Sequence, residues 1–121
     1  MGADEYAAPP PAAVADLRVT SAVTGAGVLT ATLHWTAPAS AVTTTLRYSR
    51  TLITQVNWAS ATLLTGTLPG HQNTYTASLP YASGTLFFAL KTQNAEGGWS
   101  ALSNNAFWPR RDAFLPIVLR Q

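Results

Sequence analysis

The sequence predicts an all-β fold, an antiparallel sandwich of short strands, from three observations. Beyond residue 13, apolar and polar residues alternate in steps of two through nearly the whole chain, which is the period of half-buried strands. The alternating runs are rich in Thr, Val and aromatic residues, which favour strands. Turn sequences containing Gly and Pro separate the runs at short intervals, as in sandwiches. The length of 121 residues suits a single domain.

Six runs are expected to form strands, at residues 14–21, 28–38, 43–50, 73–80, 84–92 and 99–108. A further segment, "NWASATLL" at 57–64, suits either one helical turn or a short strand, and we favour the strand because its neighbours are strands. The residues that alternate inward form the predicted core, and the principal ones are Leu33, Trp35, Leu46, Tyr48, Phe88 and Leu90.

Charge and composition argue against a nucleic-acid partner, a membrane span and disulfides. Charged residues make up only 10% of the chain, and the net charge is +2. Arg110, Arg111 and Arg120 lie near the C-terminus and the other basic residues are scattered, whereas a nucleic-acid surface needs clustered cations. No apolar run has the length of a membrane span. We therefore expect no nucleic-acid partner and no membrane span, and the absence of cysteine excludes disulfides and thiol chemistry.

The ionisable residues form no recognisable catalytic or metal-binding set. His34 and His71 have no carboxylate beside them in the sequence, whereas a zinc site takes three or more protein ligands. No two of the acids share a predicted strand face, as a two-carboxylate hydrolase requires. No serine stands in a Gly-x-Ser-x-Gly elbow. We therefore expect a protein that is not an enzyme and that has neither a metal nor a cofactor.

Four segments, in this order, resemble the fibronectin type III domain: "AVADLRVT", "LHWTAP", "LRYS" and "TLFFALKTQNAEGGWSALSN". The resemblance covers residues 14–106. It implies an immunoglobulin-like sandwich in which Trp35 is the core tryptophan of the second strand, with Leu46 and Tyr48 facing it from the third. The family consists mostly of spacer or binding modules, and a fold alone does not name a function.

One position departs from the family pattern. Members usually carry a tyrosine at the start of the sixth strand, where its hydroxyl closes the preceding corner. Here Leu86 stands at that place, and Tyr81 lies a few residues earlier. Either Tyr81 supplies the hydroxyl from a shifted corner or the hydrogen bond is lost, and we favour its loss.

The chain divides into a Pro/Ala-rich linker at 1–13, a sandwich at 14–108 and an apolar tail at 109–121, which is expected to add an extra C-terminal strand. The tail "FLPIVLR" resembles the Leu-Pro-x-Val-x-Arg endings of secreted proteins from filamentous bacteria. This second resemblance implies a secreted, extracellular or cell-surface location at the C-terminal end of a larger bacterial protein.

An uncharged stretch in the tail is the first candidate site, because such a run is expected to be buried against something. Its residues are Phe114, Leu115, Pro116, Ile117, Val118 and Leu119. Three partners are open: the chain's own sandwich, another domain of the parent chain, or a neighbouring copy that accepts the tail as a donor strand. We favour docking within the same chain, because loop closure then costs least.

Three tryptophans are candidate ligand aromatics. Trp99 is expected to cap the open end of the core rather than to contact a ligand. Trp58 either covers the sheet edge or stacks on a sugar, and Trp108 is expected to pin its ring onto the sandwich. A polysaccharide site needs two or three aromatics on one flat face, and the sequence does not place these three together.

The function expected from these observations is that of a non-catalytic extracellular module that acts as a spacer, stabiliser or surface-attachment domain. The first alternative is a self-assembling filament or surface-layer subunit that uses residues 113–120 as a donor strand. The second alternative is a glycan-binding module.

Overall fold

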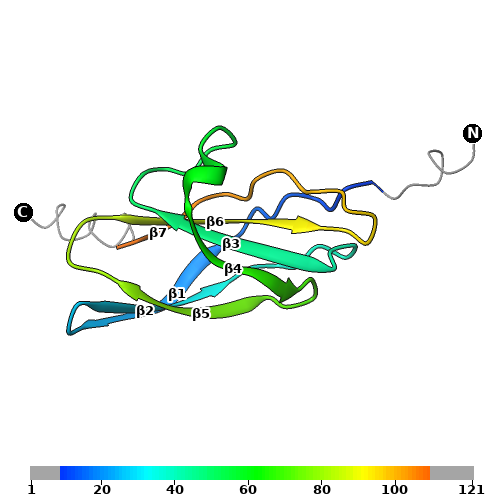
Figure 1. Ribbon diagram of the computed structural model, residues 1–121. Coiled ribbons are helices and arrows are strands. Elements are labelled where there is room, and N and C mark those ends of the chain that lie inside the picture. Colours follow the sequence, from blue (N-terminus) through cyan, green and yellow to red (C-terminus); the bar gives the residue numbers. More distant parts are fainter. Residues whose placement is uncertain (1–8, 110–121) are drawn as a thin grey trace, which may run out of the picture.

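Two antiparallel sheets packed face to face make up the computed structural model, which describes residues 9–109 (Figure 1). One sheet has the order β1-β2-β5 and the other the order β4-β3-β6-β7. The predicted antiparallel sandwich is therefore confirmed. The elements are β1 (Arg18–Gly25), β2 (Val28–His34), β3 (Thr43–Ser49), the 3₁₀ turn η1 (Trp58–Ser60), β4 (Thr62–Pro69), β5 (Thr74–Pro80), β6 (Leu86–Gln93) and β7 (Ala106–Trp108).

The three-stranded sheet follows directly from the alternating sequence. Ala26 and Gly27 both have positive φ, as a two-residue type I′ hairpin turn requires, and they join β1 to β2. Strand β2 then pairs with β5 without interruption, from Val28 opposite Pro80 to His34 opposite Thr74. The outward positions of these two strands are mostly Thr and Ser, so this face of the sandwich is polar.

The core lies between the sheets and consists of the residues that alternate inward. Of the six predicted core residues, five are buried and Tyr48 packs against them while partly exposed, which confirms the predicted strand faces. The largest fully buried side chains of this cluster are Phe88, Leu29, Leu33, Leu46, Leu86 and Leu90.

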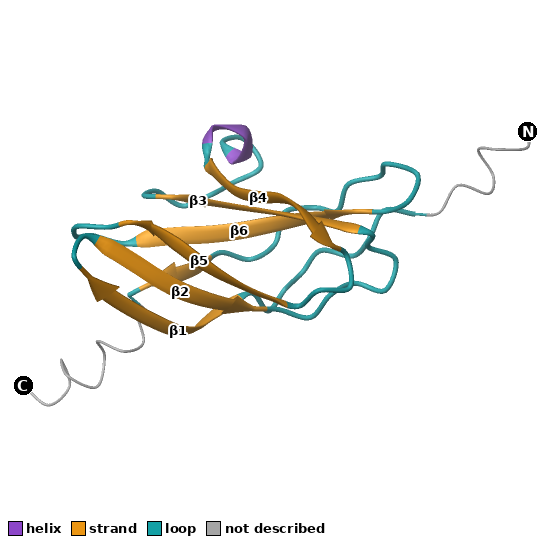
Figure 2. Ribbon diagram, turned by 60° about the horizontal axis from the view of Figure 1, so that its bottom comes forward, coloured by secondary structure: helices purple, strands orange, loops and turns teal. Residues whose placement is uncertain are grey.

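A second, smaller core lies on the outer side of the four-stranded sheet. It contains Ile53, Ala61 and Ala89, with Trp58 and Phe87 packed against it. It exists because the segment between β3 and β4 turns back over the sheet, and η1 lies on the side away from β1, β2 and β5 (Figure 2). The expected short strand at 57–64 was therefore partly wrong: its first half is the 3₁₀ turn, and only its second half enters β4.

The last strand is shorter than expected. Only Ala106–Trp108 form β7, although residues 99–105 also run beside β6. Two serine hydroxyls replace ladder carbonyls there: Ser100 Oγ accepts the Thr92 N–H at 2.9 Å, and Ser103 Oγ accepts the Leu90 N–H at 2.9 Å. Ser100 and Ser103 are three positions apart, whereas their partners Thr92 and Leu90 are two positions apart, so the ladder is irregular and the predicted strand at 99–108 is wrong in its first part.

Two adjacent asparagines hold distant segments onto this irregular strand. Asn104 accepts the Leu17 N–H through Oδ1 at 2.8 Å and donates from Nδ2 to the Leu17 carbonyl at 2.9 Å. Asn105 makes the same pair of bonds with Ile53, both at 2.9 Å. Each side-chain amide therefore acts as a strand neighbour for one residue far away in the sequence.

The corner before β6 keeps a tyrosine hydrogen bond. Tyr81 donates its hydroxyl to the Gly84 carbonyl at 2.9 Å, and its N–H donates to the Gly27 carbonyl at 2.9 Å. The expected loss of the hydroxyl bond is therefore wrong. The shift of the tyrosine from the strand into the turn moves the bond but does not remove it.

Both ends of the described chain touch the sandwich. Pro11 is buried, and the Pro9 carbonyl accepts a hydrogen bond from Asn94 Nδ2 at 3.0 Å. At the other end, Trp108 packs against the main core. The predicted tail strand, including Phe114 to Leu119, lies outside the described residues.

Replacement of Gly70 by alanine is expected to destabilise the protein by about 1–3 kcal/mol. A Cβ atom at this position would overlap the backbone of Ala41. The Gly70 N–H donates to the Val42 carbonyl at 2.9 Å, so the two backbone segments cannot move apart without loss of this hydrogen bond. Gly66→Ala is the matched control, because its Cβ would meet only Leu63 Cδ1 at 3.8 Å. Equal melting temperatures for the two variants in thermal denaturation would contradict this packing.

Candidate functional site: the outer face of the four-stranded sheet

The outer face of the sheet β4-β3-β6-β7 gathers aromatic and cationic side chains. Strand β6 supplies the central row of this face. Its residues Leu86, Phe88, Leu90 and Thr92 point into the core. The residues between them, Phe87, Ala89, Lys91 and Gln93, therefore lie along the outer face. Strand β6 lies inside the sheet, with β3 on one side and β7 on the other.

Trp58 lies over this row and contacts two cations. The Arg47 guanidinium carbon is 5.1 Å from the indole centroid, and Lys91 Nζ is 5.3 Å from it. Both distances are within the range of a cation–π attraction. Trp58 is partly buried and covers the face of the sheet, so the hypothesis that it covers the sheet edge is wrong in its position.

Polar bonds fix the segment that carries Trp58. Arg47 Nη1 donates to the Ala59 carbonyl at 3.2 Å and to the Ala61 carbonyl at 2.9 Å. Asn57 accepts the Thr54 N–H at 2.7 Å and donates to the Leu52 carbonyl at 2.9 Å. Together with the Asn105 clamp on Ile53, these bonds hold the indole ring in place over the sheet.

Trp99 lies on the same face, farther along β6. It pairs with Gln93 across an antiparallel bridge, and residues that face each other in such a bridge point to the same side of the sheet. Its exposed fraction is 47%, so the expectation that it caps the core is wrong. The inward place belongs to Ser100, which is 4% exposed and whose hydroxyl binds the Thr92 N–H.

Phe87 and Phe107 form the other end of this aromatic row. They face each other across the β6–β7 ladder, with ring centroids 5.8 Å apart and planes at 82°. This edge-to-face arrangement is favourable for aromatic pairs. No sequence pattern had singled out these two residues, because the pairing of β6 with β7 was needed to bring them together.

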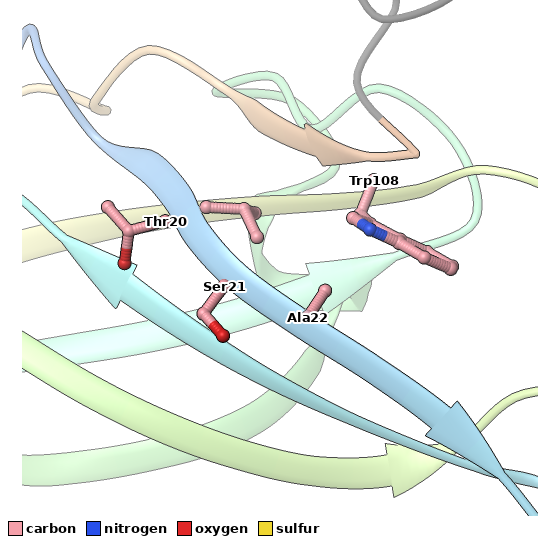
Figure 3. Close-up of a pocket in the computed structure, with 5 residues that line it drawn as sticks. Thr20, Ser21, Ala22 and Trp108 are labelled. Atoms are coloured by element: carbon pink, nitrogen blue, oxygen red, sulfur yellow. The ribbon is translucent and has the colours of Figure 1, made fainter.

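Trp108 belongs to a different place. Its ring packs against the main core and meets Tyr81 edge-on, with centroids 5.1 Å apart, which confirms that it is pinned onto the sandwich. Beside it is an open hollow of about 130 Å³, bordered by residues 19–22 of β1 (Figure 3). Of the three tryptophans named from the sequence, Trp58 and Trp99 therefore share a face and Trp108 does not.

Asp16 and His34, two ionisable residues away from this face, make local structural bonds. Asp16 accepts the Thr36 hydroxyl at 2.6 Å and the Thr36 N–H at 2.9 Å, and it lies 3.5 Å from Arg18. His34 Nδ1 is 2.7 Å from the Thr20 hydroxyl. Within residues 9–109 no three His, Asp or Glu side chains are grouped as a metal site would need. No helix in the same range is long and apolar enough to span a bilayer.

Comparison with known proteins gives the fold a name. No protein-family model matches the chain, and no curated protein sequence does. A solved structure of a Fn3-like protein from Clostridium thermocellum superposes with a TM-score of 0.60 at 20% identity, over 80% of this chain and 90% of that one. The chain has a fibronectin type III-like fold.

Larger proteins contain the same fold as one part. A pectate lyase from Pectobacterium carotovorum matches with a TM-score of 0.56 at 16% identity, over 82% of this chain and 28% of the lyase. Titin kinase with its flanking domains matches with a TM-score of 0.61 at 12% identity, over 93% of this chain and 19% of that one. At these identities the likeness concerns the fibronectin type III-like fold alone.

Asp16 is expected to make the stability of the protein depend on acid pH. The Thr36 hydroxyl, followed by the Thr36 N–H, holds the pKa of Asp16 below its ordinary value. A carboxyl whose pKa is lower in the folded state stabilises that state above its unfolded pKa of about 3.9. This stabilisation is lost as the pH falls through the folded pKa.

Thermal melts of the wild type and of Asp16→Asn from pH 6 down to pH 2 test this dependence. The variant is expected to melt lower at pH 6 and to lose less stability on acidification. Thr36→Val, which removes the hydroxyl donor, is expected to show part of the same effect. If Asp16→Asn and the wild type lose stability in parallel, Asp16 does not contribute in this way.

Proposed function

We propose that this chain is a non-catalytic module at the C-terminal end of a larger secreted bacterial protein, where it acts as a spacer, stabiliser or surface-attachment domain. The fibronectin type III-like sandwich supports a non-catalytic module in general terms. The extracellular location rests on the resemblance of the tail to endings of secreted proteins and on a polar surface rich in Thr and Ser. The pectate lyase and titin, in which the fold is one part of a longer chain, are consistent with a module.

The observation that carries the proposal is the position of the two ends of the described chain. The segment before β1 starts at one end of the sandwich, and β7 finishes at the opposite end (Figure 1). A module with this geometry separates whatever precedes it from whatever follows it by its own length. A rigid spacer needs this arrangement.

Both ends are also held by specific contacts, which a spacer needs in order to transmit position. At the entry, Asn94 binds the Pro9 carbonyl and the Asn104 N–H donates to the Val14 carbonyl at 3.2 Å. At the exit, Trp108 is wedged against Tyr81. Pro9, Val14 and Trp108, near the two ends of the described chain, are therefore fixed to the sandwich.

A filament or surface-layer subunit is the second candidate, and one surface favours it. Strand β1 is an edge strand of its sheet, and the hollow beside Trp108 borders it at the point where the chain leaves β7. A free edge of this kind can accept an added strand. Residues 113–120 of a neighbouring copy have the apolar composition and the length of such a strand.

The solution mass of the full chain, compared with that of a chain ending at Pro109, separates the two candidates. The spacer proposal expects monomers of both in light scattering at all concentrations. If the tail also docks within its own chain, the shortened chain melts at a lower temperature, because it has lost buried apolar area. If the full chain forms oligomers or fibres and the shortened chain is monomeric, the result contradicts the spacer and supports the assembly subunit.

A further inference from the structure

The row of outer-face side chains along β6 forms a continuous strip that the spacer role does not use. We define the aromatic strip as Phe107, Phe87, Trp58, Lys91, Gln93 and Trp99. Phe87, Lys91 and Gln93 come from β6 itself, and the other three rings flank it. Neighbouring same-face positions on a strand are about 6.7 Å apart, so Phe87 and Gln93, three such steps from each other, give the strip a length of roughly 20 Å along the strand axis.

We propose that the aromatic strip binds a polysaccharide that carries carboxylate groups. The strip combines exposed ring faces with polar groups. Sugar rings present C–H groups that pack on indole faces and hydroxyls that need polar partners. Trp99, at 47% exposed, offers ring surface next to Gln93, its partner across the bridge, and the Lys91 ammonium lies 5.3 Å from the centroid of the Trp58 ring.

The strip is also closed to binding by strand addition. Strand β6 has partners on both sides, so the strip offers no free backbone edge to an added peptide strand. A ligand of the strip therefore contacts side chains alone, as an extended chain of sugar rings does.

The strip also carries positive charge. Arg47 and Lys91 both lie beneath or beside the Trp58 ring, and the ion pair present among residues 9–109 joins Arg18 to Asp16, away from the strip. The acid nearest in sequence to the strip is Glu96, which lies in the exposed turn before Trp99. The centre of the strip is therefore positively charged, and carboxylates on a polymer complement it.

The experiment measures binding of the full chain to alginate, a polyuronate, and to a neutral soluble β-glucan, by affinity electrophoresis and tryptophan fluorescence. We expect retardation by alginate that weakens as salt is raised, because charges at this exposed site are screened. Retardation by the β-glucan is expected to be several-fold weaker. Equal retardation by both polymers would overturn the assignment of an acidic ligand.

Two variants locate the site, and a third serves as the control. Trp99→Ala is expected to weaken alginate binding about tenfold, the scale of one lost aromatic contact. Lys91→Gln is expected to weaken it several-fold and to reduce its salt dependence. Arg18→Gln removes an exposed cation from the other sheet and is expected to leave binding unchanged.

Three further outcomes would overturn the proposal. The first is an absence of binding to alginate by a chain whose melting temperature shows that it is folded. The second is an equal loss of binding in Arg18→Gln and Lys91→Gln, which would indicate attraction to net charge alone. The third is equally tight binding of poly-glutamate, which would assign the strip to acidic peptides. Because the light-scattering comparison does not involve the strip, its result is independent of this one.

Discussion

Two adjacent side-chain amides, those of Asn104 and Asn105, connect the parts of this sandwich that no regular sheet pairing joins. Adjacent residues of an extended chain point to opposite sides. Asn104 therefore reaches the backbone of Leu17, ahead of β1, while Asn105 reaches Ile53 in the segment over the outer face. Each amide supplies both a donor and an acceptor, so each distant residue has both its backbone groups satisfied. The entry of the chain and the position of Trp58 both depend on this one dipeptide.

The same segment shows how polar side chains decide which residues face outward. Ser100 and Ser103 take the inward positions because their hydroxyls accept hydrogen bonds from N–H groups of β6. In a regular sheet, backbone carbonyls of the neighbouring strand would accept these bonds. Trp99 is thereby turned to the outside, where it completes the row begun by Phe87 and Phe107. A larger apolar residue at position 100 would gain burial but would leave the Thr92 N–H without its partner, which is costly in a buried ladder. The outer face and the core are thus specified together.

Much of the fold could be predicted, because alternation with a period of two decides which residues of Val28–His34, Thr74–Pro80 and Leu86–Gln93 are buried. The clamps could not, since an Asn-Asn pair in a sequence does not reveal partners 87 and 52 residues away. Trp58 and Trp99 could be named as candidates, but their common face could not be predicted. The irregular register after Gln93 changes the side on which each following residue lies, and only the three-dimensional pairing reveals it. Tyr81 was misjudged for a similar reason, because its bond to Gly84 depends on the shape of the corner.

Native-state hydrogen exchange of the Leu17 and Ile53 amides tests the role of the asparagine pair most directly. We expect Asn104→Ala to speed exchange of the Leu17 amide about tenfold relative to the core amides of the same variant and to leave exchange of the Ile53 amide unchanged. Asn105→Ala is predicted to show the reverse pattern, with Ile53 accelerated and Leu17 unchanged. Core amides of the other sheet, such as that of Leu29 in the central strand β2, correct for any general loss of stability. Equal acceleration of both amides in both variants, or no acceleration in either, would contradict the claim that each asparagine holds its own segment.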